Sequence, residues 1–166
     1  MVEKLYRGKK IKWGIAGCGR FAENSFLPAV RLMRRSSVTS LYSRDFNRAK
    51  SLAEKFGVQN TFDNYDDFLK SDIDAVFVAS SNAHHFEQVI KAAKAGKNIL
   101  CEKPLAITSV QAEEMVRVCK ENNVLLAINY VHRFHPLILK AKELLVDQRL
   151  GKLVSIDVHF NIDFPP

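Results

Sequence analysis

The sequence predicts an α/β protein whose main domain is a doubly wound parallel sheet, and two observations carry this prediction. The first is a glycine-rich turn, Gly17-Cys18-Gly19-Arg20-Phe21-Ala22, which fits the pattern G-x-G-x-x-A between a strand pattern and a helix pattern. The second is the alternation of strand patterns with helical patterns from residue 11 to about residue 129. Such alternation is typical of a parallel sheet that carries helices on both faces.

The strand patterns are short and apolar. We expect strands at Ile11–Ala16, Val38–Ser43, around Thr61, Ala75–Ala79, Asn98–Cys101 and Val124–Ile128. Ala75–Ala79 is continuously apolar, which is typical of a parallel strand covered on both faces. Val124–Ile128 is likewise expected to be buried.

Helices are expected between these strands, because apolar residues recur there at helical spacing. The apolar sets are Phe26-Ala29-Val30-Met33, Phe46-Ala49-Ala53-Phe56, Phe86-Val89-Ile90-Ala93 and Ala112-Met115-Val116-Cys119, with a short helix at Tyr65–Leu69. Pro28 lacks an N–H group and should kink the first helix. Asp45, Asn82 and Thr108 are expected to cap the helices that follow them, and Gly57 to end one.

The pattern changes after residue 129. A helix is expected from Pro136 to Gly151, and residues 153–164 alternate strictly between apolar and polar side chains, as in a strand of a one-sided antiparallel sheet. We therefore expect residues 1–129 to form a Rossmann domain. Residues 130–166 would be a linker helix and the first strand of an incomplete α+β second domain.

Composition excludes several classes of protein. The chain of 166 residues is 47% hydrophobic and 26% charged, so we expect a folded core, and its net charge of +7 favours an anionic partner. No basic stripe interleaved with aromatic residues is present, so DNA binding would rest on charge alone and no nucleic-acid partner is expected. No apolar run is long enough for a signal peptide or a membrane span. Three cysteines without a C-x-x-C pair fit a reducing cytoplasm.

The glycine-rich turn predicts dinucleotide binding. Gly17 permits a backbone conformation closed to other residues, and Gly19 lets the main chain approach a pyrophosphate closely. The small Ala22 allows the helix to pack on the strand, and the helix N-terminus offers N–H groups to phosphates. The alternative is a glycine-rich turn that binds nothing.

Ligands of such sheets bind beyond the carboxyl ends of the strands. An NAD enzyme usually has Asp or Glu after its second strand, whereas this chain has Ser43-Arg44, with Arg48 one helical turn further on. A hydroxyl and a guanidinium bind a 2′-phosphate that a carboxylate would repel, so NADP is the expected cofactor and NAD the second possibility. The alternative is a solvated Ser-Arg pair on a surface turn.

Two further strand ends carry polar residues. Asn82 and His85 follow the strand at Ala75–Ala79, and His85 either faces the cofactor or is a surface residue. Lys103 follows the next strand, where a lysine donates a hydrogen bond or a proton, and Glu102 beside it is either a site residue or its salt-bridge partner. His132 and His135 invite a metal interpretation, but no carboxylate stands near them in the sequence, so no metal site is expected.

Two segments resemble the Gfo/Idh/MocA family of NAD(P)-dependent oxidoreductases. Ala95–Leu105 (AGKNILCEKPL) is similar to the family's segment around Glu-Lys-Pro, and Asn129–Pro136 (NYVHRFHP) is similar to a second family segment. The resemblance implies hydride transfer between nicotinamide and a sugar- or polyol-like alcohol or ketone, in a homo-oligomer. It implies a proton-transfer role for Lys103. It also implies that a second domain supplies further substrate-binding residues.

The expected site residues follow from these motifs and from the resemblance. The catalytic residue would be Lys103. The cofactor would be bound by Gly17, Cys18, Gly19, Arg20, Phe21, Ser43, Arg44, Arg48, Ser80, Asn82, His85, Glu102, Lys103 and Asn129. The rival from another functional class is a non-catalytic NADP-binding or regulatory module, which needs the same cleft but no proton relay.

Overall fold

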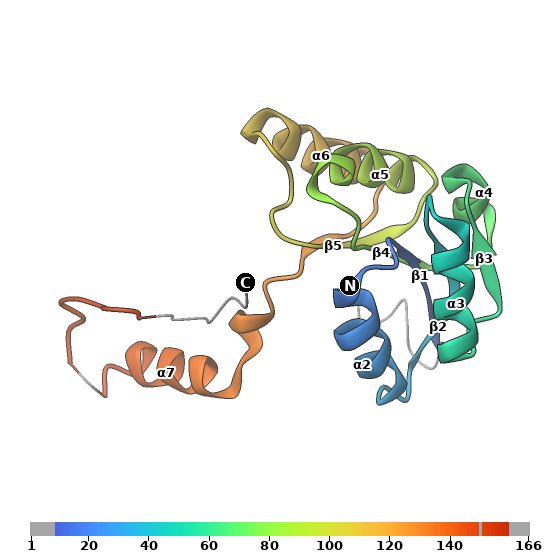
Figure 1. The fold of residues 1–166 in the computed structure, drawn as a ribbon. Coiled ribbons are helices and arrows are strands. Elements are labelled where there is room, and N and C mark those ends of the chain that lie inside the picture. Colours follow the sequence, from blue (N-terminus) through green and yellow to red (C-terminus); the bar gives the residue numbers. More distant parts are fainter. Residues whose placement is uncertain (1–8, 150, 160–166) are drawn as a thin grey trace. The chain divides into compact units, whose positions relative to one another are not determined.

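The computed structural model describes residues 9–149 and 151–159. The chain falls into two compact units, Met1–Asn129 and Tyr130–Pro166. The first unit contains the sheet and the helices that cover it (Figure 1).

A parallel sheet of six strands forms the first unit. The strands are β1 (Ile11–Ala16), β2 (Ser36–Tyr42), β3 (Asn60–Phe62), β4 (Ala75–Val78), β5 (Asn98–Cys101) and β6 (Leu126–Ile128). Their order in the sheet is β3-β2-β1-β4-β5-β6, and each neighbouring pair is parallel. The order reverses between β1 and β4, which is the switch point where ligands of doubly wound sheets bind. The predicted fold class is confirmed.

Helices connect the strands and lie on both faces of the sheet (Figure 1). They are η1 (Ala22–Phe26), α2 (Leu27–Arg31), α3 (Phe46–Phe56), α4 (Tyr65–Lys70), α5 (Asn82–Lys94) and α6 (Ser109–Glu121). Two apolar clusters result. Ile15 and Phe77 pack with η1, α2 and α3, whereas Ala16, Val76 and Val78 pack with α4, α5 and α6. Successive residues of one strand therefore enter different cores, because side chains alternate across a sheet.

Local signals fix several helix ends as predicted. The Asp45 carboxylate caps α3 by accepting from the Arg48 N–H, and the Thr108 hydroxyl caps α6 by accepting from the Gln111 N–H. Gly57 ends α3 in the left-handed conformation. The predicted cap at Asn82 is wrong. Ser81 is the N-cap of α5, without a side-chain cap bond, and Asn82 is already the first helical residue.

The first helix departs from the predicted pattern. Ala22–Phe26 forms a π-helical turn two residues before Pro28, whose missing N–H removes an α-helical hydrogen bond. The wider turn shifts the buried face, so Ala22, Leu27 and Val30 are buried. Ala29 and Met33, which the regular spacing placed in the core, are exposed.

The last strand is less buried than predicted. β6 covers only Leu126–Ile128, and its central residue Ala127 is exposed, as is Leu125 before it. The reason is topological, because β6 lies at the edge of the sheet and pairs with β5 on one side. An apolar sequence run does not distinguish an edge strand from a central one.

Among its described residues, the second unit contains a 3₁₀ turn, η2 (Val131–Phe134), and a helix, α7 (Pro136–Val146). The helix begins at Pro136 as predicted, but it ends at Val146, with Asp147 as its C-cap, rather than at Gly151. The predicted strand at 153–164 is not formed by residues 153–159, and residues 160–164 lie outside the described part of the chain. Within the described residues no neighbouring strand is present to pair with this segment. None of the described helices is both long and apolar enough to cross a membrane.

Candidate cofactor-binding site

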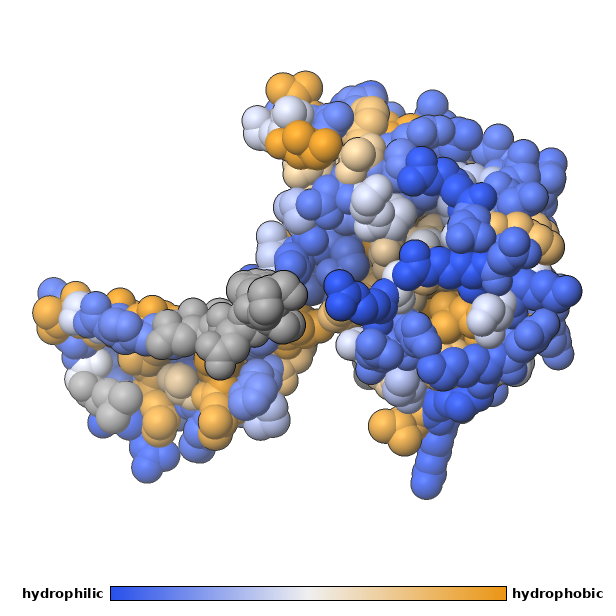
Figure 2. Space-filling view, viewed as in Figure 1, coloured by the Kyte–Doolittle hydropathy of each residue, from blue (hydrophilic) through white to orange (hydrophobic). Residues whose placement is uncertain are grey.

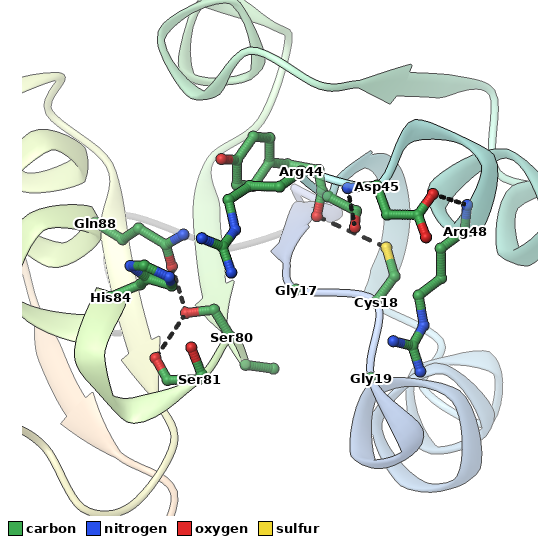
Figure 3. A pocket seen from close by; sticks show the side chains of 13 residues that line it. Gly17, Cys18, Gly19, Arg44, Asp45, Arg48, Ser80, Ser81, His84 and Gln88 are labelled. Carbon is green, nitrogen blue, oxygen red and sulfur yellow. Dashed lines mark hydrogen bonds between the residues drawn. The ribbon is translucent and has the colours of Figure 1, made fainter.

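A pocket of about 630 Å³ lies at the carboxyl ends of β1, β2 and β4 (Figure 3). Its volume is in the range typical of small-molecule sites. The lining residues come from the end of β2, from the turns after these three strands and from the first turns of α3 and α5. They are Gly17, Cys18, Gly19, Tyr42, Ser43, Arg44, Asp45, Arg48, Ala79, Ser80, Ser81, His84 and Gln88.

The glycine-rich turn forms the floor of this pocket. Gly17 has φ +106°, and its N–H donates to the Tyr42 carbonyl at 2.9 Å. A β-carbon on Gly17 would come 2.5 Å from the Ser80 nitrogen, so glycine is required there by the protein's own backbone. Gly19 differs, because no protein atom lies within 4 Å of a β-carbon built on it. The space above Gly19 is therefore open to a ligand that approaches the main chain.

Cys18, between these glycines, is buried and donates its thiol to the Tyr42 carbonyl at 3.6 Å. Burial raises the pKa of the Cys18 thiol to about 11, although the nearby Arg48 charge opposes this shift. The turn consequently carries a neutral thiol at pH 7. It adds no negative charge where phosphate groups would bind.

The turn after β2 and the first turn of α3 bring two cations to the pocket, Arg44 and Arg48. Figure 3 shows the Arg44 guanidinium pointing toward Ser80 and His84, and the Arg48 guanidinium beside Gly19. Both side chains are exposed, and in the described part of the chain neither has an ion-pair partner. Two guanidinium groups without anionic partners make this end of the pocket suited to an anion.

Asp45 is the single acid among the described residues that line the pocket. Its Oδ1 accepts from the Arg48 backbone N–H at 3.2 Å, and its own N–H donates to the Ser43 hydroxyl at 3.2 Å. The carboxylate is thus engaged at the N-terminus of α3. The Ser43 oxygen acts as acceptor in this contact, which leaves its hydroxyl hydrogen available to donate to a ligand.

The wall opposite Arg44 comes from the turn after β4 and from α5. The Ser80 hydroxyl donates to Gln88 Oε1 at 2.7 Å, and His84 lies beside this pair (Figure 3). Sequence reasoning missed Tyr42, Asp45, Ala79, Ser81, His84 and Gln88 as pocket residues. The spacing of His84 and Gln88, four residues apart on one helix, was the signal that placed them on one face.

The structure brings together seven of the predicted cofactor residues: Gly17, Cys18, Gly19, Ser43, Arg44, Arg48 and Ser80. The others lie outside the pocket lining: Arg20, Phe21, Asn82, His85, Glu102, Lys103 and Asn129. Glu102 accepts from Asn129 Nδ2 at 2.5 Å, and this bond joins the end of β5 to the end of β6. Lys103 is exposed after β5, its backbone N–H faces Glu102 Oε2 at 3.3 Å, and the Lys103–Pro104 peptide is cis.

Metal-binding side chains do not gather in this structure. Within residues 9–149 and 151–159, no group of three or more His, Cys, Asp or Glu side chains is placed to hold a metal ion. The three cysteines are buried and not in disulfides.

Comparison with known proteins agrees with the fold. The model of the oxidoreductase family with an NAD-binding Rossmann fold matches residues 11–130. A curated relative, the dTDP-3,4-didehydro-2,6-dideoxy-alpha-D-glucose 3-reductase of Actinomadura kijaniata, is 34% identical over 166 residues, with 99% of this chain and 49% of that protein covered. The NADP(+)-dependent D-xylose 1-dehydrogenase 2 of Haloferax volcanii is 32% identical, with coverage of 92% and 47%. This chain thus spans about half the length of the curated relatives it matches.

Solved structures give the same result. A 3-ketoreductase from Actinomadura kijaniata in complex with NADP superimposes with a TM-score of 0.79 at 33% identity, covering 87% of this chain and 46% of that one. The apo scyllo-inositol dehydrogenase of Lactobacillus casei gives a TM-score of 0.81 at 27% identity, with coverage of 86% and 43%.

Fold and site together define the class as an NAD(P)-binding Rossmann domain. The chain belongs to the Gfo/Idh/MocA family of oxidoreductases, as its Glu-Lys-Pro segment predicted.

Proposed function

We propose that this chain is the NADP(H)-binding half of an oxidoreductase that transfers a hydride between nicotinamide and a sugar- or polyol-like alcohol or ketone. The observation that carries the choice of NADP is the pair Arg44 and Arg48, two guanidinium groups at the carboxyl end of β2 without ion-pair partners in the described chain. NADP carries a 2′-phosphate, which is an anion that such a pair of guanidinium groups binds. NAD has an uncharged hydroxyl group in the place of this phosphate.

The remaining pocket residues fit the rest of the cofactor. The open space above Gly19 and the N–H groups that follow it suit a pyrophosphate, and the wall of Ser80, His84 and Gln88 faces the adenosine end. The Asp45 carboxylate serves as the N-cap of α3 by accepting from the Arg48 N–H, and the two guanidinium groups outnumber this single acid. The bound nicotinamide supplies the hydride chemistry, and the protein supplies orientation and proton transfer.

Lys103 is the residue we assign to proton transfer. It follows β5, the strand next to β4, so it stands at the same carboxyl edge of the sheet as the pocket. An ammonium group there donates a proton to a substrate oxygen during reduction and receives it back during oxidation. The names of the relatives support the substrate class, since they act on a deoxysugar nucleotide and on xylose.

The rival is a non-catalytic NADP-binding or regulatory module. One observation favours it, namely that Lys103 does not line the pocket in the described part of the chain. The two functions share the cofactor pocket and differ in whether the complete protein turns over a substrate, which requires a proton relay only in the enzyme. We also infer a homo-oligomer and a cytoplasmic location, the latter supported by three buried cysteines that form no disulfide.

The proposal is tested by titrating the chain with NADPH and with NADH and following the cofactor fluorescence. Tighter binding of NADPH is the expected result. Equal affinities, or tighter binding of NADH, would contradict the assignment of Arg44 and Arg48 to the 2′-phosphate.

A further inference from the structure

His85 lies in the first turn of α5 and is completely buried, yet both of its ring nitrogens face carbonyl oxygens. Nδ1 lies 2.9 Å from the Pro104 oxygen, and Nε2 lies 3.2 Å from the Ser80 oxygen. Ser80 belongs to the pocket wall, and Pro104 follows Lys103 directly. One buried ring therefore lies between the cofactor pocket and the segment that carries Lys103.

The Pro104 contact is the shorter of the two ring contacts. A carbonyl oxygen only accepts, so in this contact Nδ1 carries a hydrogen and donates to Pro104. Pro104 itself is exposed, so without this donor its carbonyl would bond to water instead and the Pro104 segment would shift toward solvent.

The segment from Glu102 to Pro104 has few other anchors. On its N-terminal side, the Glu102 N–H donates to the Val78 carbonyl at 2.9 Å, and the Glu102 carboxylate is held by Asn129. The Lys103 side chain is exposed and has no ion-pair partner among the residues described. Its position is therefore set by the backbone, which on the C-terminal side is held by the His85 contact to Pro104 and by the packing of Leu105 and Ala106 against the core.

We propose that His85 is a positioning residue, whose Nδ1–H donates to the Pro104 carbonyl and thereby fixes Lys103 relative to the cofactor pocket. This assignment replaces direct contact with the cofactor, which the sequence had suggested for His85. Only the expected effect on turnover depends on the proposed role of Lys103 in proton transfer. The hydrogen bond itself is tested independently of catalysis.

Three substitutions separate the two ring nitrogens. In His85→Asn the amide nitrogen is attached at the same carbon position as Nδ1, whereas in His85→Gln it lies one bond further out, as Nε2 does. His85→Leu fills part of the volume and removes both donors. All three variants remove the ring, so differences between Asn and Gln report the position of the donor.

The first measurement is hydrogen exchange of the amides at residues 102–106 in the chain without cofactor. We expect His85→Gln and His85→Leu to accelerate exchange there at least tenfold more than His85→Asn does. Equal exchange in the Asn and Gln variants, or protection restored by Gln alone, would overturn the proposal. If the Leu variant does not fold, the comparison of Asn with Gln still decides it.

The second measurement is turnover of the complete protein. A displaced Lys103 should lower kcat by about 10²-fold in the Gln variant, with the Kd for NADPH changed little, and the Asn variant should recover most of the rate. A merely structural role would instead lower thermal stability in all variants without this kcat difference. One outcome is that neither the parent protein nor any variant shows oxidoreductase activity while hydrogen exchange at residues 102–106 still follows the expected pattern. In that case the proposed function fails, and the role of His85 in holding the Pro104 segment stands.

Discussion

Gly17 lies directly against Ser80, so that a β-carbon on residue 17 would come 2.5 Å from the Ser80 nitrogen. The contact joins the turn after β1 to the turn after β4, on the two sides of the switch point. Residue 17 must therefore lack a side chain, because a β-carbon there would collide with the backbone. A β-carbon on residue 19 would instead meet open space. The two glycines of the motif have different tasks.

Gly17→Ala should destabilise the fold, because the new methyl group meets backbone atoms and φ +106° is strained for alanine. We expect a loss of roughly 2–4 kcal/mol in the free energy of unfolding, measured by urea denaturation. Gly19→Ala is the matched control, with little change in stability but weaker cofactor binding. Equal stability of both variants would contradict the different roles.

Arg44→Ala should weaken NADPH binding selectively. The loss of a charge-assisted hydrogen bond to the 2′-phosphate costs roughly 1.5–3 kcal/mol, whereas NADH lacks that phosphate and should bind nearly unchanged. Fluorescence titration of both cofactors measures the difference. Lys50→Ala is a control for general loss of surface charge, since Lys50 is exposed on α3 and does not line the pocket. A parallel loss for NADH and NADPH would show that Arg44 does not read the phosphate.

Lys103→Ala in the complete protein should reduce turnover while cofactor affinity survives. Removal of a general acid or base typically costs about 10²–10⁴-fold in rate. Steady-state kinetics and a cofactor titration separate the two effects. Lys120→Ala, an exposed lysine on α6, provides the control. A near-normal rate in the Lys103 variant would show that Lys103 is only structural.

The native thiols should resist modification. Burial raises the pKa of Cys18 to about 11 and that of Cys101 to about 12, and it also raises the pKa of Cys119. Because the thiolate is the reactive form, a disulfide reagent at pH 8 should react slowly with the folded chain and rapidly with three thiols in denaturant. Rapid reaction of the native chain would show that these sites open readily.

The isolated chain should self-associate through its second unit. Leu153, Val154, Ile156 and Val158 are all more than half exposed, and Figure 2 shows further apolar side chains at the surface around α7. An apolar segment without a partner strand is a template for pairing with a second copy. Light scattering on the purified chain measures this association. A clean monomer at high concentration, with rapid amide exchange at 153–159, would contradict the prediction.

Much of the first unit was predictable because its signals are local. The glycine motif, the continuous apolar run of β4 and the caps at Asp45 and Thr108 each depend on residues within a few positions of one another. The buried face of the first helix was predicted wrongly, because the π turn at Ala22–Phe26 changes the helical period. The exposure of β6 was also missed, because sheet order is a property of distant segments.

The sequence by itself determined the doubly wound sheet, the glycine-rich turn and the chemical types at the strand ends. Only the tertiary structure decided which of those residues share one pocket. It placed Arg44 and Arg48 there together with His84 and Gln88, and it turned His85 away into the core between two carbonyl groups. The physical reason is that adjacent residues of one helix turn point in different directions by about 100°. Which neighbour meets the pocket and which meets the core depends on how the helix packs against the sheet.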